Sequence, residues 1–267
     1  MITAFALSFN VAAIAVYLAA SGYLVVQFVR KEEVNKLWLL ALACCALTLH
    51  GLGVTNTIFS SDGLQFGIFK VSSLIFWVIN TIVLASSLKK PLHNLFVLLF
   101  PLSALAVLIS IFSNSPQLLY AQLDQGLISH ILLSILAYSL LTIASMQALL
   151  LAFQNHQLRS KQPTGAVRLL PPLQTMEALL FEILWAGMLL LTLSIATGFI
   201  FLHDIFAQHL AHKTLFSLLA WCIYATLLWG RHKLGWRGNT AIRWTLVGFT
   251  ALMLAYFGSK LVLEVLL

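Results

Sequence analysis

The chain contains eight apolar stretches of roughly the length of one membrane crossing, and this pattern limits its fold more than any other feature. The hydrocarbon core of a bilayer is about 30 Å thick and takes about 20 apolar residues per helix. The stretches cover residues 5–28, 37–58, 67–88, 95–112, 127–153, 180–202, 215–229 and 242–267. Helices are the expected spanning element, because each one satisfies its own backbone N–H and C=O groups. The sequence therefore predicts an all-α integral membrane protein, a bundle of eight transmembrane helices.

The overall composition agrees with that pattern and excludes other classes of protein. Of the 267 residues, 61% are hydrophobic and only 9% are charged, and the mean hydropathy is +0.97. Soluble domains carry about a quarter charged residues, so a soluble globular enzyme is excluded. An outer-membrane barrel is excluded as well, because its strands alternate in polarity over about ten residues and contain no long apolar runs.

The basic residues predict the direction in which the chain crosses the membrane. Twelve of the fifteen Lys and Arg residues fall in the first, third, fifth and seventh connections between apolar stretches, counting Arg243, the second residue of the eighth stretch, with the seventh connection. Cytoplasmic loops carry such an excess, so we expect these connections inside and both termini outside, N-out and C-out. Orientation thereby explains the net charge of +7, and we expect the lipid bilayer and no nucleic acid as a partner.

The chain is expected to form a single transmembrane domain, residues 1–267. The longest connection, residues 154–179, is polar and contains Pro163, Pro171 and Pro172, which is typical of a linker and not of a folded domain. Basic residues follow the first apolar stretch and none precedes it. That order is the reverse of a secretory signal peptide, so we expect this stretch to be a transmembrane helix.

Charged residues inside the apolar stretches are few and give no sign of catalysis. Those that occur near the ends of the stretches are Lys70, Glu177, Glu182, Lys260 and Glu264. Long side chains within about two turns of a span end reach water, so we expect these residues to be interface anchors. The sequence has no Walker loop, GxSxG elbow, HExxH motif or paired carboxylate. We therefore expect that the protein is not an enzyme.

Histidines are the strongest candidates for binding a ligand. Five of the eight are expected towards the outer face: His50, His130, His203, His209 and His212. Neutral imidazole is a common ligand of haem iron and of zinc. For His50, a hydrogen bond to a neighbouring helix and ligation fit the sequence equally well, and for His130 ligation and interfacial solvation do. The other three suit a solvated outer connection, and we expect no separate metal site.

Several short motifs resemble those of a known family. They are LHGLG at His50, SHILLSILAYSLL around His130, LPPLQTMEALL before the sixth span, and the run from His212 to Gly258 with Arg231, Gly235-Trp236 and Gly238. These motifs are similar to the CcsA-type cytochrome c assembly proteins, and the number of spans resembles their short YpjD/HemX-like branch. The resemblance implies a location in the bacterial inner membrane and haem as the cofactor. It also implies His50 and His130 as haem-binding residues, with His212 as a further outer candidate.

The sequence also departs from the family's pattern. The haem synthases of the family carry a Trp-rich outer segment that has no counterpart between the sixth and seventh spans here. Trp229 stands at a position that resembles one of their membrane histidines, and the given sequence ends at Leu267, before the last outer one. Because only His50 and His130 match the family's ligand positions, we expect no complete bis-histidine haem synthase.

Two functions are compatible with these features. The first is a protein that binds or escorts haem at the outer face, together with components of cytochrome c maturation. The second is a non-enzymatic accessory or regulatory subunit of another membrane protein, such as a transporter, with no haem bound. The small connections and the missing ligand positions favour the second, whereas the motif resemblance favours the first.

Overall fold

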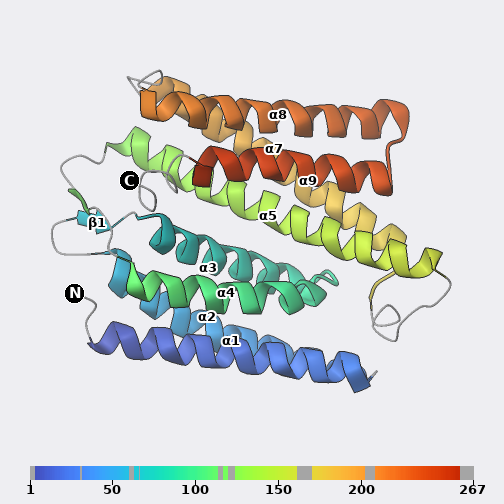
Figure 1. Cartoon of the computed structure of the whole chain (residues 1–267), viewed down its shortest axis with the longest axis horizontal. Helices are drawn as coiled ribbons and strands as arrows, with labels where there is room; N and C mark the ends of the chain where they lie inside the picture. Colours follow the sequence, from blue (N-terminus) through green and yellow to red (C-terminus); the bar gives the residue numbers. More distant parts are fainter. Residues whose placement is uncertain are drawn as a thin grey trace. The chain divides into compact units, whose positions relative to one another are not determined.

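Eight long helices make up most of the described chain (Figure 1). The computed structural model describes residues 4–30, 32–59, 63–65, 67–113, 117–119, 124–160, 170–201 and 208–258. Each of the eight helices is long and apolar enough to cross a membrane. The predicted all-α membrane fold with eight spans is confirmed, and the outward orientation of the two termini stays a prediction.

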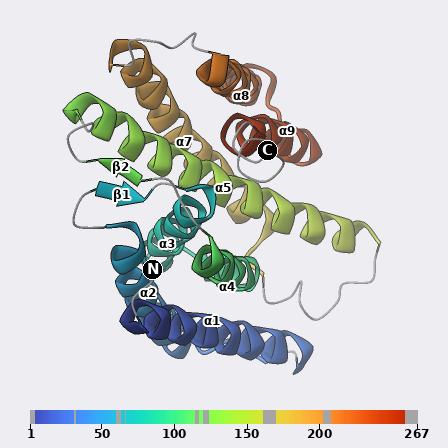
Figure 2. The same cartoon turned by 60° about the vertical axis from the view of Figure 1, so that its left-hand side comes forward.

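Four helices form the first of two compact units. They are α1 (Ala4–Arg30), α2 (Lys36–Ile58), α3 (Ile68–Ser87) and α4 (Phe96–Phe112), and a 3₁₀ turn, η1 (His93–Leu95), leads into α4. The helices alternate in direction, and each packs against two others, in the ring α1–α2–α3–α4 (Figure 2). A small antiparallel ribbon lies at one end of this unit, formed by β1 (Gly63–Gln65) and β2 (Gln117–Leu119).

The other four helices form the second unit. They are α5 (Gln125–Arg159), α7 (Leu173–Phe201), α8 (Gln208–Leu234) and α9 (Asn239–Met253), and α9 continues into a π-helical turn, η3 (Leu254–Gly258). They also alternate in direction and contact one another in a ring, α5–α7–α8–α9. Each unit is therefore an up-and-down four-helix bundle. The prediction of a single domain is not decided by this division and stays a prediction.

The longest contact in the second unit joins α5 and α7, and small residues make it close. Gly187 of α7 faces Leu141 of α5, and a Cβ added at Gly187 would come within 2.8 Å of Leu141 Cδ2. Two turns of helix further on, the hydroxyls of Ser134 and Ser194 are hydrogen-bonded at 2.7 Å. Membrane helices associate through such small and weakly polar side chains, because lipid tails give no hydrophobic force between helices.

Several helices extend beyond the apolar stretches that predict them. α5 ends at Arg159 and α7 begins at Leu173, so the predicted linker of residues 154–179 is wrong at both ends. Polar residues continue a helix outside the hydrocarbon core because its backbone hydrogen bonds persist there. The start of α5 has an N-cap, where the Asp124 carboxylate accepts from the backbone N–H of Gly126 at 3.2 Å.

Candidate functional site

His50 lies in the interior of the first unit and bridges three of its helices. Its side chain, on α2, is fully buried. The hydroxyl of Tyr17 on α1 is 3.0 Å from Nδ1, and the hydroxyl of Ser73 on α3 is 2.9 Å from Nε2. A neutral imidazole has one donor and one acceptor nitrogen, so one hydroxyl donates to the ring and the other accepts from it. Both ring nitrogens are therefore engaged within the protein.

The surroundings of His50 are polar for the middle of a membrane bundle. Tyr17 is fully buried and packs edge-to-face on the His50 ring, with ring centroids 5.7 Å apart. In the same unit, the buried Asn80 side chain donates to the Ser103 hydroxyl at 2.6 Å, which joins α3 to α4. These uncharged contacts hold the four helices in register and leave the two nitrogens of His50 no free lone pair for a metal.

His130 has a different environment, at the start of α5 in the second unit. Its side chain is half-buried. Nδ1 is 2.9 Å from the backbone carbonyl oxygen of Ser194 on α7, and the Thr197 hydroxyl is 3.4 Å from the same nitrogen. The ring lies over Gly198, where an added Cβ would come within 3.1 Å of Cε1. The absence of a side chain at Gly198 thus makes room for the imidazole.

The carbonyl partner determines the protonation of the His130 ring. A carbonyl oxygen only accepts, so Nδ1 carries the proton and donates it to Ser194. In a neutral ring the lone pair is then on Nε2, to which no described residue is hydrogen-bonded. A histidine that binds a metal commonly donates its other N–H to a carbonyl, which orients the ring and raises its basicity. The geometry therefore leaves His130 Nε2 available as a ligand.

The side chains of the other three candidate histidines are not among those that the structure describes. His209 and His212 are in the first turns of α8, where only the backbone is described. His203 lies outside the described residues. The solvated outer connection expected for the three residues and the role of His212 as a further haem-binding candidate therefore stay predictions. Within the described ranges, no group of three or more His, Cys, Asp or Glu side chains is arranged to hold a metal ion.

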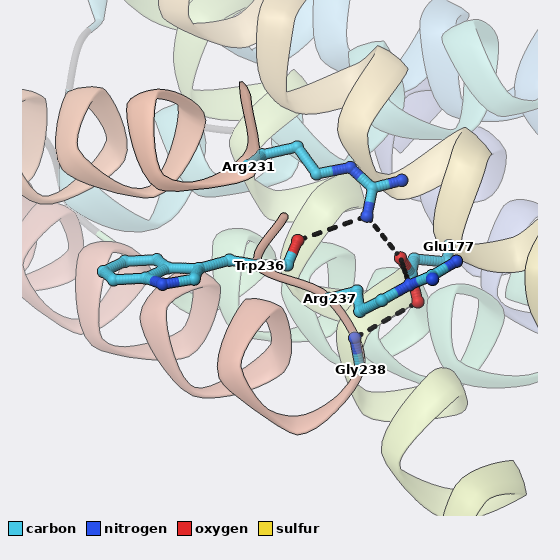
Figure 3. A network of polar contacts seen from close by, with 5 residues as sticks. All are labelled: Glu177, Arg231, Trp236, Arg237 and Gly238. Carbon is cyan, nitrogen blue, oxygen red and sulfur yellow. Dashed lines mark hydrogen bonds and ion pairs between the residues drawn. The ribbon is translucent and has the colours of Figure 1, made fainter. Parts of the chain in front are cut away.

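A cluster of charged residues lies at one end of the second unit, and the sequence pattern does not predict that they contact one another (Figure 3). Glu177, in the second turn of α7, is only 6% exposed. The Arg231 guanidinium donates to Oε1 at 2.8 Å, and the backbone N–H of Gly238 donates to Oε2 at 3.1 Å. Arg237 adds an ion pair, with Nε 3.8 Å from Oε1. We call this cluster of Glu177, Arg231, Arg237 and Gly238 the carboxylate clamp.

The carboxylate clamp connects α7 to the tight turn between α8 and α9. Arg231 also donates to the backbone carbonyl of Trp236 at 3.2 Å and lies 4.4 Å above the centre of the Phe181 ring. Gly238 has a φ of 56°, a left-handed conformation that favours glycine. The interface-anchor prediction for Glu177 is therefore wrong, because its carboxylate is buried and bound by two protein hydrogen-bond donors and one further ion pair instead of water. Its partners Arg231, Arg237 and Gly238 fall within the C-terminal motif, and that motif is the one sequence feature that marks these residues.

Lys70 differs from its prediction for a similar reason. It is in the first turn of α3, yet its side chain is buried and not extended to water. Its ammonium donates to the side-chain oxygen of Gln65 on β1. The ribbon that supplies Gln65 is made of three-residue strands, too short for an alternating pattern to predict.

The end of the C-terminal motif forms an aromatic cluster around Tyr138 of α5. The rings of Phe249, Tyr256 and Phe257 have centroids 5.7–6.1 Å from that of Tyr138, and the Tyr138 hydroxyl donates to the sulfur of Met253. Tyr256 and Phe257 belong to the π-helical turn η3. A π-turn rotates the following side chains relative to an α-helix, and here it presents both rings to α5.

Comparisons with known proteins agree with the motifs in this arrangement. A family model described as cytochrome C assembly protein matches residues 38–267, which include the whole of α2 beyond its first turn and all later helices. The inner membrane protein YpjD of Escherichia coli is 29% identical over 227 residues, which cover 85% of each chain. An uncharacterised 28.8 kDa protein of Azospirillum brasilense is 36% identical over 52% of each chain.

A third relative and the search of solved structures complete the comparison. Protein HemX of Brevibacillus brevis is 24% identical over 134 residues, which cover 49% of each chain. No solved structure matches. With eight membrane-spanning helices and a relative named as an inner membrane protein, the chain is a multi-pass protein of the bacterial inner membrane.

Proposed function

The chain belongs to the family of cytochrome c assembly proteins, and on that premise we propose that it binds haem at the outer face of the inner membrane. In this proposal it holds or escorts haem for c-type cytochrome maturation and catalyses no reaction of its own. The observation that carries the proposal is His130, whose Nδ1 donates to the Ser194 carbonyl and whose Nε2 is left for a ligand.

The chemistry of its two ring nitrogens makes His130 suitable as an axial ligand of haem iron. A bound haem would supply an iron with an open coordination position, and imidazole nitrogen is its common protein ligand. The role of this chain is to orient the ring: Ser194 fixes the tautomer, Thr197 lies beside the same nitrogen, and Gly198 provides space. A single histidine ligand gives weaker retention than two, which suits a protein that passes its cofactor on.

His50 and His212 have secondary roles in this proposal. His50 becomes a ligand only if the Ser73 hydroxyl leaves Nε2, so a second site inside the first unit requires a rearrangement. His212, in the first turns of α8, is retained as a candidate for the outer site. Components of cytochrome c maturation are the proposed partners, and an apocytochrome or another haem carrier is the kind of protein that would take the cofactor.

The alternative is an accessory subunit of another membrane protein with no haem bound. The pairing of both His50 nitrogens with hydroxyls supports it, because a position that resembles a family ligand acts here as a structural bridge. Purification with one stoichiometric membrane partner and no haem would favour this alternative over the first proposal.

A hemin titration of the purified full-length protein tests the proposal. The Soret absorption is followed for the wild type, for His130→Ala, and for His156→Ala as a matched control on the same helix. His156 is exposed near the other end of α5. We expect His130→Ala to weaken hemin binding by about tenfold or more and His156→Ala to leave it unchanged. No Soret change with the wild type, or equal binding by all three proteins, would overturn the proposal.

A further inference from the structure

Three buried polar atoms without a partner belong to two adjoining elements, the end of α3 and η1, at one end of the first unit. They are Oγ of Ser87, Nδ1 of His93 and Nδ2 of Asn94. Ser87 is the last residue of α3, and the other two belong to η1, which packs against both α3 and α4. Ser87 is fully buried and Asn94 is 6% exposed. Buried polar groups in folded proteins nearly always have a hydrogen-bond partner, so three such atoms without one on adjoining elements call for an explanation.

All three atoms are able to donate a hydrogen bond. The Asn94 amide nitrogen only donates, a serine hydroxyl donates or accepts, and a histidine Nδ1 donates in one of its two neutral tautomers. An acceptor-rich group is therefore the partner that satisfies all three atoms together. A carbonyl or a single water meets only one or two of them.

The start of a helix adds to the same local polarity. η1 and α4 form a continuous helical segment, whose N-cap residue, Leu92, offers no side-chain acceptor. The first backbone N–H groups of a helix have no intrahelical partner and carry a partial positive charge. Phosphate and other anions bind at such helix starts. Here the helix start coincides with the unpartnered side chains of His93 and Asn94.

Positive side chains surround this end of the unit. Lys36 at the start of α2 is exposed and close enough to His93 to act on it electrostatically. Lys89 is exposed on the connection between α3 and η1. The nearest carboxylates along the chain, Glu32 and Glu33, are exposed, and neither forms an ion pair with Lys36 among the described residues. The cluster therefore has an excess of positive charge.

We propose that this end of the first unit binds the phosphate group of an anionic phospholipid, with Asn94, Ser87 and His93 as hydrogen-bond donors and Lys36 and Lys89 at the entrance. The basic connections place this end at the inner face by the positive-inside rule, where anionic lipids are accessible. Phosphate oxygens supply the several acceptors that the three orphaned atoms lack. The three atoms are enclosed in the unliganded chain, so the proposal requires the half-buried His93 ring to turn toward the headgroup as it enters and to donate to it from the new position.

Native mass spectrometry of the full-length protein in neutral detergent tests the site. Phosphatidylglycerol, phosphatidylcholine and inorganic phosphate are added separately, which distinguishes a lipid headgroup from free phosphate. We expect phosphatidylglycerol to bind, phosphatidylcholine to bind more weakly, and inorganic phosphate to bind least. Asn94→Leu should weaken phosphatidylglycerol binding by about tenfold, because a hydrogen bond to a charged group is lost. The double variant Lys36→Gln/Lys89→Gln should weaken it similarly.

A control variant and a stability measurement test whether the loss of lipid binding is specific to this site. Arg243→Gln, an exposed cation at the basic end of the second unit, is the matched control and should leave the tightest lipid in place. Asn94→Leu also removes a buried orphan, so without lipid its melting temperature should equal or exceed that of the wild type. Binding that is unchanged in Asn94→Leu, lost equally in Arg243→Gln, or equal for the two lipids would overturn the proposal. Tight binding of inorganic phosphate alone would overturn the assignment to a lipid.

Discussion

His50 and His130 share a residue type and a family resemblance, yet the two units use them differently. In the first unit, both nitrogens of His50 are bonded to side-chain hydroxyls from other helices, and the ring is fully buried. In the second unit, one nitrogen of His130 is bonded to a backbone carbonyl and the ring is half-buried. A backbone carbonyl fixes the tautomer and cannot rotate away, whereas hydroxyls can both donate and accept. The two sets of partners therefore leave different groups open: both nitrogens of His50 are engaged, whereas Nε2 of His130 has no hydrogen-bond partner among the described residues.

The largest expected difference is in stability. His50→Ala removes two hydrogen bonds, leaves the Tyr17 and Ser73 hydroxyls unpaired and creates a cavity, so it should lower the free energy of unfolding by about 3 kcal/mol. His130→Ala, at a half-buried position, should lower it by less than about 1 kcal/mol. Unfolding in a mixed-micelle titration measures both. Equal losses in the two variants would remove the structural contrast between the sites.

Removing the two hydroxyls that are hydrogen-bonded to His50 should make this residue more like His130. The double variant Tyr17→Phe/Ser73→Ala removes both hydroxyls and keeps the histidine, at an expected cost of about 1–2 kcal/mol. If the hydroxyls are what prevents ligation, the folded variant should take up a second equivalent of hemin, measured as the stoichiometry of the Soret titration. Adding His50→Phe to this background should abolish the extra equivalent. An unchanged stoichiometry in a folded double variant would show that the hydroxyls are not the barrier.

A smaller effect is expected from crowding the His130 ring. In Gly198→Ala the new Cβ is tight against the ring, at 3.1 Å from Cε1, and shifts it from the Ser194 carbonyl. We expect hemin binding to weaken by about threefold. Gly22→Ala on α1 is the matched control, since an added Cβ there meets nothing within 4 Å. Hemin affinity that falls equally in both variants would mean that the Gly198 effect is a general one.

The smallest effect is expected at Thr197. Its hydroxyl is 3.4 Å from Nδ1 of His130, a weak contact beside the bond to Ser194 at 2.9 Å. Thr197→Val keeps the shape and removes the hydroxyl, so hemin affinity should change by less than about twofold. A larger change in the same titration would assign the tautomer of His130 to Thr197 and not to the carbonyl.

The sequence predicts the spans well, because hydropathy over about 20 residues measures the same property that the bilayer selects. The seventh span is longer than its apolar stretch of residues 215–229, because α8 begins at Gln208 and ends at Leu234. The ends of α5 and α7 are less predictable, because polar helical turns outside the hydrocarbon leave no hydropathy signal. For His50, a hydrogen bond to a neighbouring helix was one of two equal alternatives, and the structure shows that bond.

The hydrogen-bond partners of His50 and His130 cannot be predicted from the sequence pattern. Tyr17 is 33 residues from His50, and Ser194 is 64 residues from His130. Serine, threonine and tyrosine occur throughout apolar spans, so nothing local marks the ones that face a histidine. The Ser194 contact is harder still to predict, because it uses a backbone carbonyl and carries no residue preference.

The carboxylate clamp has a consequence for how the protein is inserted into its membrane. Glu177 finds its donors only when the start of α7 and the turn between α8 and α9 emerge on the same side of the bilayer. A last hairpin inserted in the opposite sense would leave this carboxylate at the membrane edge with no cation, and would carry Arg231 and Arg237 across the hydrocarbon. The clamp thus makes the correct topology of the final two helices the one that satisfies their charges, and it closes only after those helices have been synthesised.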